Sequence, residues 1–166
     1  FDPVWAQLRT ASPPGQTHEL RADGRSIPWL AKALKESSPE RFADWKEHVA
    51  TALPQVTDID AIERDDDHHA YLAVTYNNQY TVSSSGLSEG TLRILALTLI
   101  PYLDDPPHYM VVEEPENGTH PRAIEAVLQS LGSVYGRQVV VSSHSPIVVA
   151  QTALEDIHAA RMEKTG

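Results

Sequence analysis

Three short segments place chemically capable polar residues directly beside apolar runs. In the first, residues 87–91, Ser88 and Gly90 stand immediately before a strongly apolar stretch. Unsatisfied backbone N–H groups and a hydroxyl at a helix start form a natural anion site, because the donors and the helix dipole both favour negative charge. The alternative is that Ser88 only caps this helix, with Glu89 in its first turn.

The second segment carries adjacent carboxylates, Glu113 and Glu114, directly after the apolar run 109–112. Open α/β sheets bind ligands at the carboxyl ends of their strands. Carboxylates there can hold magnesium, directly or through water, and can orient or deprotonate an attacking water. An acidic surface loop is the alternative that this motif alone leaves open.

The third segment, residues 139–146, is again an apolar run followed by polar residues, among them His144. A lone histidine at such a place is more often a loop residue than a catalyst, and the absence of a Gly-x-Ser-x-Gly elbow argues against a Ser-His hydrolase. Three aspartates and two histidines at residues 65–69 could bind a metal, although a solvated acidic turn is the stronger interpretation.

Taken in order, the three segments resemble the carboxyl-terminal half of ABC-type ATPases. The similarity is strongest to the soluble AAA/ABC ATPases related to the RecF, SMC and OLD (overcoming lysogenization defect) proteins. The sequences LSEGTLR (87–93), VVEEPENGTHP (111–121) and VVVSSHSP (139–146) would be the signature loop, the Walker B motif with its D-loop, and the switch histidine. The resemblance covers most of the chain and is most specific over residues 86–146.

The resemblance implies roles for the residues of the first two motifs. Ser88 and Gly90 would reach the γ-phosphate of ATP bound by the opposing subunit. Glu113 would take the Walker B acid position and support Mg²⁺, although transporter-like relatives usually have aspartate there. Glu114 would be the general base or water-orienting carboxylate, with Glu116 as the next candidate.

The resemblance also assigns the remaining site residues. Asn117 and Gly118 lie in the D-loop region and would contribute to nucleotide binding, and His144 would sense the γ-phosphate. The implied cofactors are ATP and Mg²⁺. Glu89 occupies the third signature position, which makes the motif less diagnostic of a transporter.

A phosphate-binding loop is missing from this sequence. The Walker A motif requires Gly-x-x-x-x-Gly-Lys-Ser/Thr, and no glycine here is followed by lysine. That loop cradles the β- and γ-phosphates, so these 166 residues alone are expected to be inactive. In the resembling family the loop lies upstream, and we therefore expect this chain to be a carboxyl-terminal segment of a longer ATPase.

The elements that position these motifs can be predicted from apolar spacing. One helix begins near Ser26 with Pro28 in its first turn, and a second runs from near Ser38 to Pro54. Residues 70–85 form a β-hairpin that turns at residues 77–78. Buried strands at 109–112 and 139–141 alternate with helices that begin at residues 121 and 146, which is typical of a parallel sheet.

The expected fold is therefore α/β: a P-loop NTPase of ABC-ATPase type, with a partial parallel sheet and with helical and hairpin segments. We expect one domain over residues 1–166. It comprises a helical and linker lead-in (1–69), the hairpin (70–85) and a core with the three motifs (86–166).

Composition excludes several other classes of protein. Hydrophobic residues make up 41% and charged residues 22%, as in ordinary globular domains. Thirteen Lys and Arg against 23 Asp and Glu give a charge of −10, which disfavours nucleic-acid binding over the whole surface but allows a local basic patch. There is no cysteine, and no apolar run is long enough to span a bilayer.

The expected function is ATP binding and hydrolysis by an ATP-sandwich homodimer in the cytoplasm, with no membrane partner. By resemblance, turnover would drive a DNA-repair or phage-defence effector, such as a nuclease, or would act on DNA. The partners would be a second copy of the protein and the upstream Walker A half. Two alternatives remain open: a non-catalytic dimerisation module that supplies signature contacts in trans, and a transporter ATPase subunit.

Overall fold

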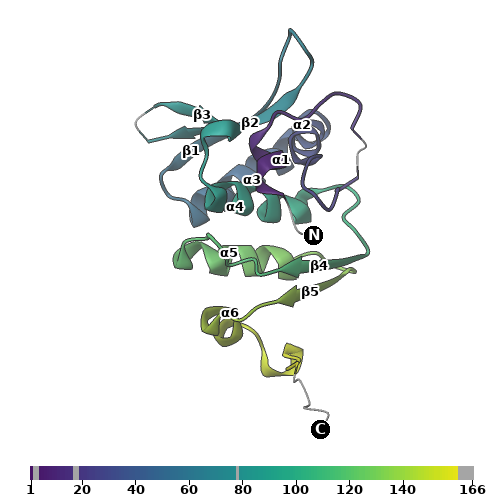
Figure 1. The fold of residues 1–166 in the computed structure, drawn as a ribbon, viewed down its shortest axis with the longest axis vertical. Helices are drawn as coiled ribbons and strands as arrows, with labels where there is room; N and C mark the ends of the chain where they lie inside the picture. The colour runs from purple at the N-terminus through teal and green to yellow at the C-terminus, as the bar shows by residue number, and fades with distance from the viewer. Residues whose placement is uncertain (2–3, 17–18, 78, 161–166) are drawn as a thin grey trace.

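The computed structural model describes residue 1 and residues 4–16, 19–77 and 79–160. Figure 1 shows two parts stacked along the long axis, with a central helix between them. The upper part holds α1 (Trp5–Arg9), α2 (Ile27–Ser37), α3 (Pro39–Ala52), β1 (Val56–Glu63), β2 (Ala70–Tyr76), β3 (Thr81–Ser83) and the 3-10 turn η1 (Ser84–Gly86). The central helix is α4 (Glu89–Leu99), which continues into η2 (Ile100–Tyr102). The lower part holds β4 (Tyr109–Glu113), α5 (Pro121–Gly132), β5 (Gln138–Ser142), α6 (Pro146–Gln151) and η3 (Leu154–Asp156).

Helices α2 and α3 confirm the two predicted amphipathic helices. Pro28 lies in the first turn of α2, and α3 ends before Pro54. The predicted cap is wrong in detail, because the Ser26 hydroxyl accepts no bond from the helix and instead accepts one from the Arg21 N–H at 3.0 Å. Trp45 of α3 is fully buried and donates its indole N–H to the Thr98 hydroxyl of α4 at 3.1 Å.

A three-stranded antiparallel sheet, in the order β1-β2-β3, contains the predicted hairpin as β2 and β3. Of the predicted turn, Asn77 is described, and Asn78 lies outside the described residues. Strand β1 falls within residues 1–69, where only helices and linkers were expected. Its register shifts between Val56 and Asp58, so the buried residues Val56, Ile59 and Ala61 do not alternate as in a regular strand.

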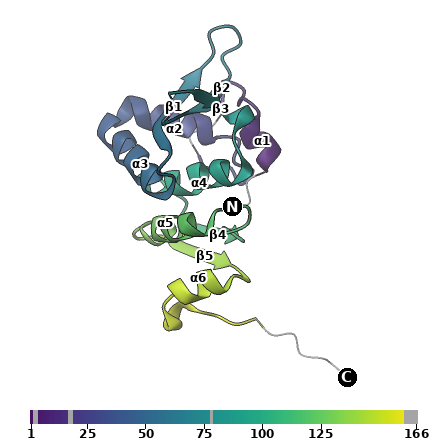
Figure 2. The same cartoon turned by 90° about the vertical axis from the view of Figure 1, so that its left-hand side faces the viewer.

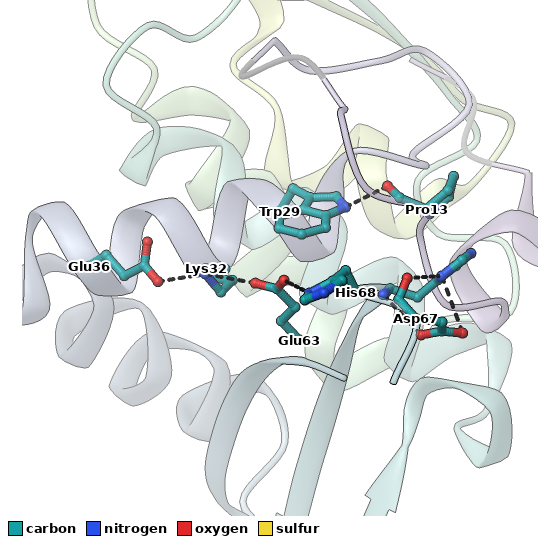
Figure 3. Close-up of polar contacts among 8 residues, drawn as sticks. Pro13, Trp29, Lys32, Glu36, Glu63, Asp67 and His68 are labelled. Atoms are coloured by element: carbon teal, nitrogen blue, oxygen red, sulfur yellow. Dashed lines mark hydrogen bonds and ion pairs between the residues drawn. The ribbon is translucent and has the colours of Figure 1, made fainter. Parts of the chain in front are cut away.

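A chain of ion pairs ties α2 to the turn between β1 and β2 (Figure 3). The Lys32 ammonium lies 2.6 Å from Glu36 and 3.3 Å from Glu63, and the His68 Nδ1 atom lies 2.9 Å from the other Glu63 oxygen. The hydrogen bond with His68, followed by that with Lys32, holds the pKa of the Glu63 carboxyl below its usual value. The turn is thereby fixed against α2.

The same turn was the candidate metal site at residues 65–69. Asp67 pairs instead with Arg64 at 2.6 Å and with His69 at 3.3 Å. Within the described parts of the chain, no group of three or more metal-ligating side chains is placed to hold an ion. The Asp67 carboxylate is thus engaged in ion pairs within the turn itself.

Helix α4 forms the centre of the hydrophobic core. Every residue from Gly90 to Leu99 is buried, so the helix is covered on all sides by α3, α5 and the upper part. Such complete burial fits the apolar circumference expected from the sequence. It also fixes the position of the helix start, which carries Ser88 and Gly90.

Strands β4 and β5 pair in parallel, which confirms the predicted parallel sheet. Their predicted burial on both faces is wrong. Met110 and Val112 belong to the core, whereas Tyr109 is 58% exposed and Val140 is 41% exposed. Parallel strands are buried on both faces only when helices cover both, and in the described residues this pair has one covered face (Figure 2).

None of the helices among the described residues has the length and apolar character needed to span a bilayer.

Candidate functional site

The register of the parallel pair brings the second and third motifs together. Glu113 at the end of β4 pairs with Ser142 at the end of β5. One residue further on, the Glu114 N–H donates to the Ser142 carbonyl at 2.9 Å. The polar loops that follow the two strands therefore begin side by side, at the edge of the sheet where ligands of α/β proteins bind.

The side chains of Glu114 and His144 face each other across this edge. The His144 Nε2 atom lies 3.5 Å from the Glu114 Oε1 atom. The Glu114 side chain is 28% exposed, whereas that of His144 is 96% exposed. Glu114 is thus partly enclosed, and His144 projects outward from the same edge, where it is accessible to a ligand.

The backbone at Glu114 has an unusual conformation that neighbouring groups hold in place. Its φ is 42°, in the left-handed region that non-glycine residues rarely adopt. Its carbonyl accepts hydrogen bonds from the Asn117 N–H at 2.9 Å and from the buried guanidinium of Arg93 on α4. Such conformations cost about 1–3 kcal/mol and persist where surrounding contacts fix them, often at functional sites.

A second carboxylate, Glu116, joins the loops after β4 and β5. Its Oε1 atom accepts a hydrogen bond from the Ser143 hydroxyl, which in turn accepts one from the Ser145 N–H at 3.0 Å. The Glu116 Oε2 atom is buried and has no hydrogen-bond partner among the described residues. Glu116 therefore has a structural role in joining the two loops, and it retains one acceptor oxygen.

The start of α4 packs directly on the loop after β4. A Cβ atom built on Gly90 would lie 2.2 Å from the Gly118 carbonyl oxygen and 3.5 Å from the Thr119 Cα atom. Gly118 itself has a φ of 69°. Glycine is thus required at position 90 by contact within one chain, and the first motif meets the second in the same molecule.

Ser88 occupies the N-cap position of α4. Its hydroxyl oxygen accepts a hydrogen bond from the Thr91 N–H at 3.1 Å and lies 2.9 Å from the Thr91 hydroxyl. The capping interpretation of Ser88 is therefore confirmed. A serine hydroxyl has two acceptor lone pairs and one donor, so capping leaves it able to bind a further group. Its signature role stays a prediction.

Of the remaining predicted residues, Glu113 ends β4 and Asn117 lies in the loop that follows it, and both are exposed. Magnesium usually takes one or two carboxylates and completes its shell with phosphate oxygens and waters. An exposed carboxylate beside Glu114 fits such a shared shell. The structure thus gathers Glu113, Glu114, Asn117, Gly118 and His144 at one edge, with Gly90 packed against it.

Sequence reasoning missed two residues that build this site, Arg93 and Ser143. Arg93 on α4 is 6% exposed, and its guanidinium donates a hydrogen bond to the Glu114 carbonyl. A charged residue inside an otherwise apolar helix was the available signal, because buried arginines are almost always paired. The partner of Ser143, by contrast, is 27 residues away in sequence, and no local pattern indicates it.

The β4-α5-β5 unit, with its acidic and histidine-bearing loops at the strand ends, defines the class as α/β with a parallel strand pair. Residues 17–150 match the family described as "AAA domain, putative AbiEii toxin, Type IV TA system". The match spans most of the sequence, and the chain belongs to this family of AAA-type ATPases.

Solved structures align with this chain, and the first of the two below shares its fold. One, described as "Structural biochemistry of ATP-driven dimerization and DNA stimulated activation of SMC ATPases", aligns with a TM-score of 0.56 and 11% identity over 74% of this chain and 78% of that one. Another, the Smc head domain with an extended coiled coil bound to the C-terminal domain of ScpA from Pyrococcus furiosus, has a TM-score of 0.49 and 11% identity, over 75% and 44% of the two chains. Among curated proteins, none matches the sequence significantly.

Proposed function

We propose that this chain supplies the signature, Walker B and switch-histidine parts of an ATPase that binds and hydrolyses ATP between two copies of the protein. The observation that carries the proposal is the meeting of Glu114 and His144, 3.5 Å apart, at the carboxyl ends of two parallel strands. Membership of an AAA-type family supports the same conclusion.

In this proposal Glu114 orients the attacking water and accepts its proton. Its side chain is partly enclosed, and its backbone is held by the Ser142 carbonyl and by Arg93. A fixed carboxylate lowers the barrier because phosphoryl transfer depends mainly on positioning and on electrostatic stabilisation. His144, exposed beside it, donates a hydrogen bond to the γ-phosphate.

Glu113 would hold the Mg²⁺ ion together with phosphate oxygens and waters. When bound, the ion neutralises charge that develops on the phosphate oxygens. Asn117 and Gly118, in the turn after Glu114, would contribute backbone and amide groups at the subunit interface.

Ser88 and the backbone N–H of Gly90 would bind the γ-phosphate of ATP held by the partner subunit. The start of an 11-residue helix presents unsatisfied N–H donors and the positive end of its dipole. Because Gly90 packs on Gly118 within one chain, movement of the loop after β4 would be transmitted to the helix start. This contact would couple the two sites of a dimer.

The phosphate-binding loop would come from an upstream half of the protein, since no glycine in this sequence is followed by lysine. We further propose that turnover drives an effector in defence or acts on DNA. The family description names a toxin–antitoxin system, and the description of the SMC relative names DNA-stimulated activation.

Substitution of Glu114 by glutamine tests this function in the chain combined with its phosphate-loop half. The amide keeps the size of the side chain but cannot accept the proton, so hydrolysis should fall by roughly 10²–10⁴-fold while ATP binding survives. Glu125→Gln, on the exposed face of α5, is the matched control and should leave turnover unchanged. Near wild-type hydrolysis by Glu114→Gln would exclude this residue as the base and direct attention to Glu116.

A further inference from the structure

An open cavity of about 620 Å³ lies in the upper part of the molecule, away from the Glu114 site. It is bounded by the end of α1, the residues at the base of the β1–β2 turn and the segment from β3 into η1. Its lining includes Arg9, Arg64, His69, Tyr71 and residues 83–85. Cavities of roughly 300–1,000 Å³ are typical of small-molecule sites.

The polar groups of this cavity are mainly hydrogen-bond donors. Two arginines line it together with Ser83 and Ser85, whose hydroxyls form a hydrogen bond of 2.8 Å with each other. Guanidinium and hydroxyl donors at close range match the geometry of a phosphate group. Such a concentration is notable in a chain whose formal charge is −10.

The two arginines differ in whether a carboxylate neutralises their charge. Arg64 forms an ion pair with Asp67 at 2.6 Å, and the same carboxylate lies 3.3 Å from His69. Arg9 has no carboxylate partner among the described residues, and its guanidinium contacts the Ser85 carbonyl at 3.5 Å. Arg9 has no acidic partner among the described residues, and it lies beside a hydroxyl pair that has one proton left to donate, so this wall of the cavity is suited to bind an anion.

The walls of the cavity are held in place before any ligand binds. Ser12 and Ala70 exchange backbone hydrogen bonds of 2.7 and 2.9 Å, which fix the segment after Arg9 against β2. The buried Ser84 hydroxyl donates to the Arg9 carbonyl at 3.5 Å and joins η1 to α1. A preformed site loses little conformational entropy on binding.

We propose that this cavity binds a small ligand bearing a phosphate or pyrophosphate group, with Arg9 as its principal anchor. The ligand would accept hydrogen bonds from the Arg9 guanidinium and from the one hydroxyl of the Ser83–Ser85 pair that does not donate to the other. Because η1 leads within two residues to Ser88, the bound ligand would contact the segment that precedes α4. The site does not depend on ATP hydrolysis by the protein.

Isothermal titration of the chain with inorganic phosphate and with pyrophosphate tests the proposal directly. Pyrophosphate should bind, and Arg9→Gln should weaken its binding by roughly tenfold or more, as expected for the loss of a charge-assisted hydrogen bond. Arg9→Lys should restore part of the affinity. Arg41→Gln, which removes the same charge on the distant helix α3, should bind as the wild type does.

Three outcomes would overturn the proposal. The first is absence of pyrophosphate binding to the wild-type chain. The second is equal weakening by Arg9→Gln and Arg41→Gln, because binding would then reflect overall charge. The third is that the wild-type chain binds duplex DNA instead of pyrophosphate, and that Arg9→Gln abolishes this DNA binding. Urea unfolding of each variant, measured in parallel, shows that the compared proteins are folded.

Discussion

Replacement of Gly90 by alanine tests whether the start of α4 packs on the loop after β4 in the same chain. The added Cβ would lie 2.2 Å from the Gly118 carbonyl oxygen and 3.2 Å from its carbonyl carbon. Both atoms belong to the main chain, so the two segments must separate by about 1 Å to reach an ordinary contact distance. Overpacking of this kind costs about 1–3 kcal/mol.

A second effect acts in the opposite direction. Alanine favours a helix over glycine by up to about 1 kcal/mol, and less at a helix end than in its interior. The free energy of unfolding should therefore fall by about 1–2 kcal/mol in Gly90→Ala. This loss of stability is expected without any nucleotide, so it can be distinguished from a loss of phosphate binding.

Urea unfolding followed by circular dichroism measures this difference, and Gly132→Ala provides the control. Gly132 ends α5, and a Cβ atom built there would meet nothing within 4 Å. Its substitution should be neutral or slightly stabilising. If Gly90→Ala unfolds at the same urea concentration as Gly132→Ala, or at a higher one, the packing of α4 on Gly118 is refuted.

Three further predictions concern the cap, the buried arginine and the ion-pair network. Ser88→Ala should lose about 1 kcal/mol of stability in urea unfolding, because the Thr91 N–H loses its acceptor, whereas Ser88→Asp should keep the cap and the stability. Arg93→Met should lower the free energy of unfolding by about 1–3 kcal/mol, measured in the same way, because the Glu114 carbonyl loses a charged donor; an unchanged value would contradict that contact. The pKa of Glu63 is lowered in the folded protein, so its ion pairs stabilise the fold above the usual carboxyl pKa of about 4.3 and are lost as the pH falls through the lowered value. The difference in urea midpoint between wild type and Glu63→Gln should accordingly be largest at pH 6 and shrink as the pH is lowered below 4, and a constant difference would contradict this assignment.

Local patterns predicted the elements whose signals lie within one segment. Pro28 and Pro39 mark the starts of α2 and α3, and alternation marks the hairpin of β2 and β3. Strand β1 escaped prediction because its bulge at Val56 and Asp58 interrupts the alternation on which a strand prediction depends. Exposure of Val140 was not predictable either, since it depends on what covers the sheet.

The candidate site, too, has one part that local sequence patterns predict and one part that they do not. Parallel pairing of β4 and β5 follows from the strand–helix–strand pattern, and it places Glu114 and His144 at one edge. The close approach of Gly90 to Gly118 and the contact of Arg93 with the Glu114 carbonyl join segments more than 20 residues apart. Such contacts arise from tertiary packing, which no local spacing encodes.

The central claim is a composite ATP site, in which one subunit's Glu114 acts on ATP bound beside the other subunit's Ser88. Mixing two inactive variants of the complete ATPase tests it. Ser88→Asp keeps the helix cap but places a carboxylate against the γ-phosphate, and Glu114→Gln removes the base. Each variant alone should be inactive, because both of its sites carry the lesion.

A mixed dimer would carry both lesions in one site and none in the other. Random pairing makes half of the dimers mixed, and each retains one of its two sites, so hydrolysis should recover to about a quarter of the wild-type rate. Size-exclusion chromatography of the mixture verifies that dimers form. Recovery to this level is the predicted result, and the absence of recovery from folded, dimerising proteins would contradict the composite site.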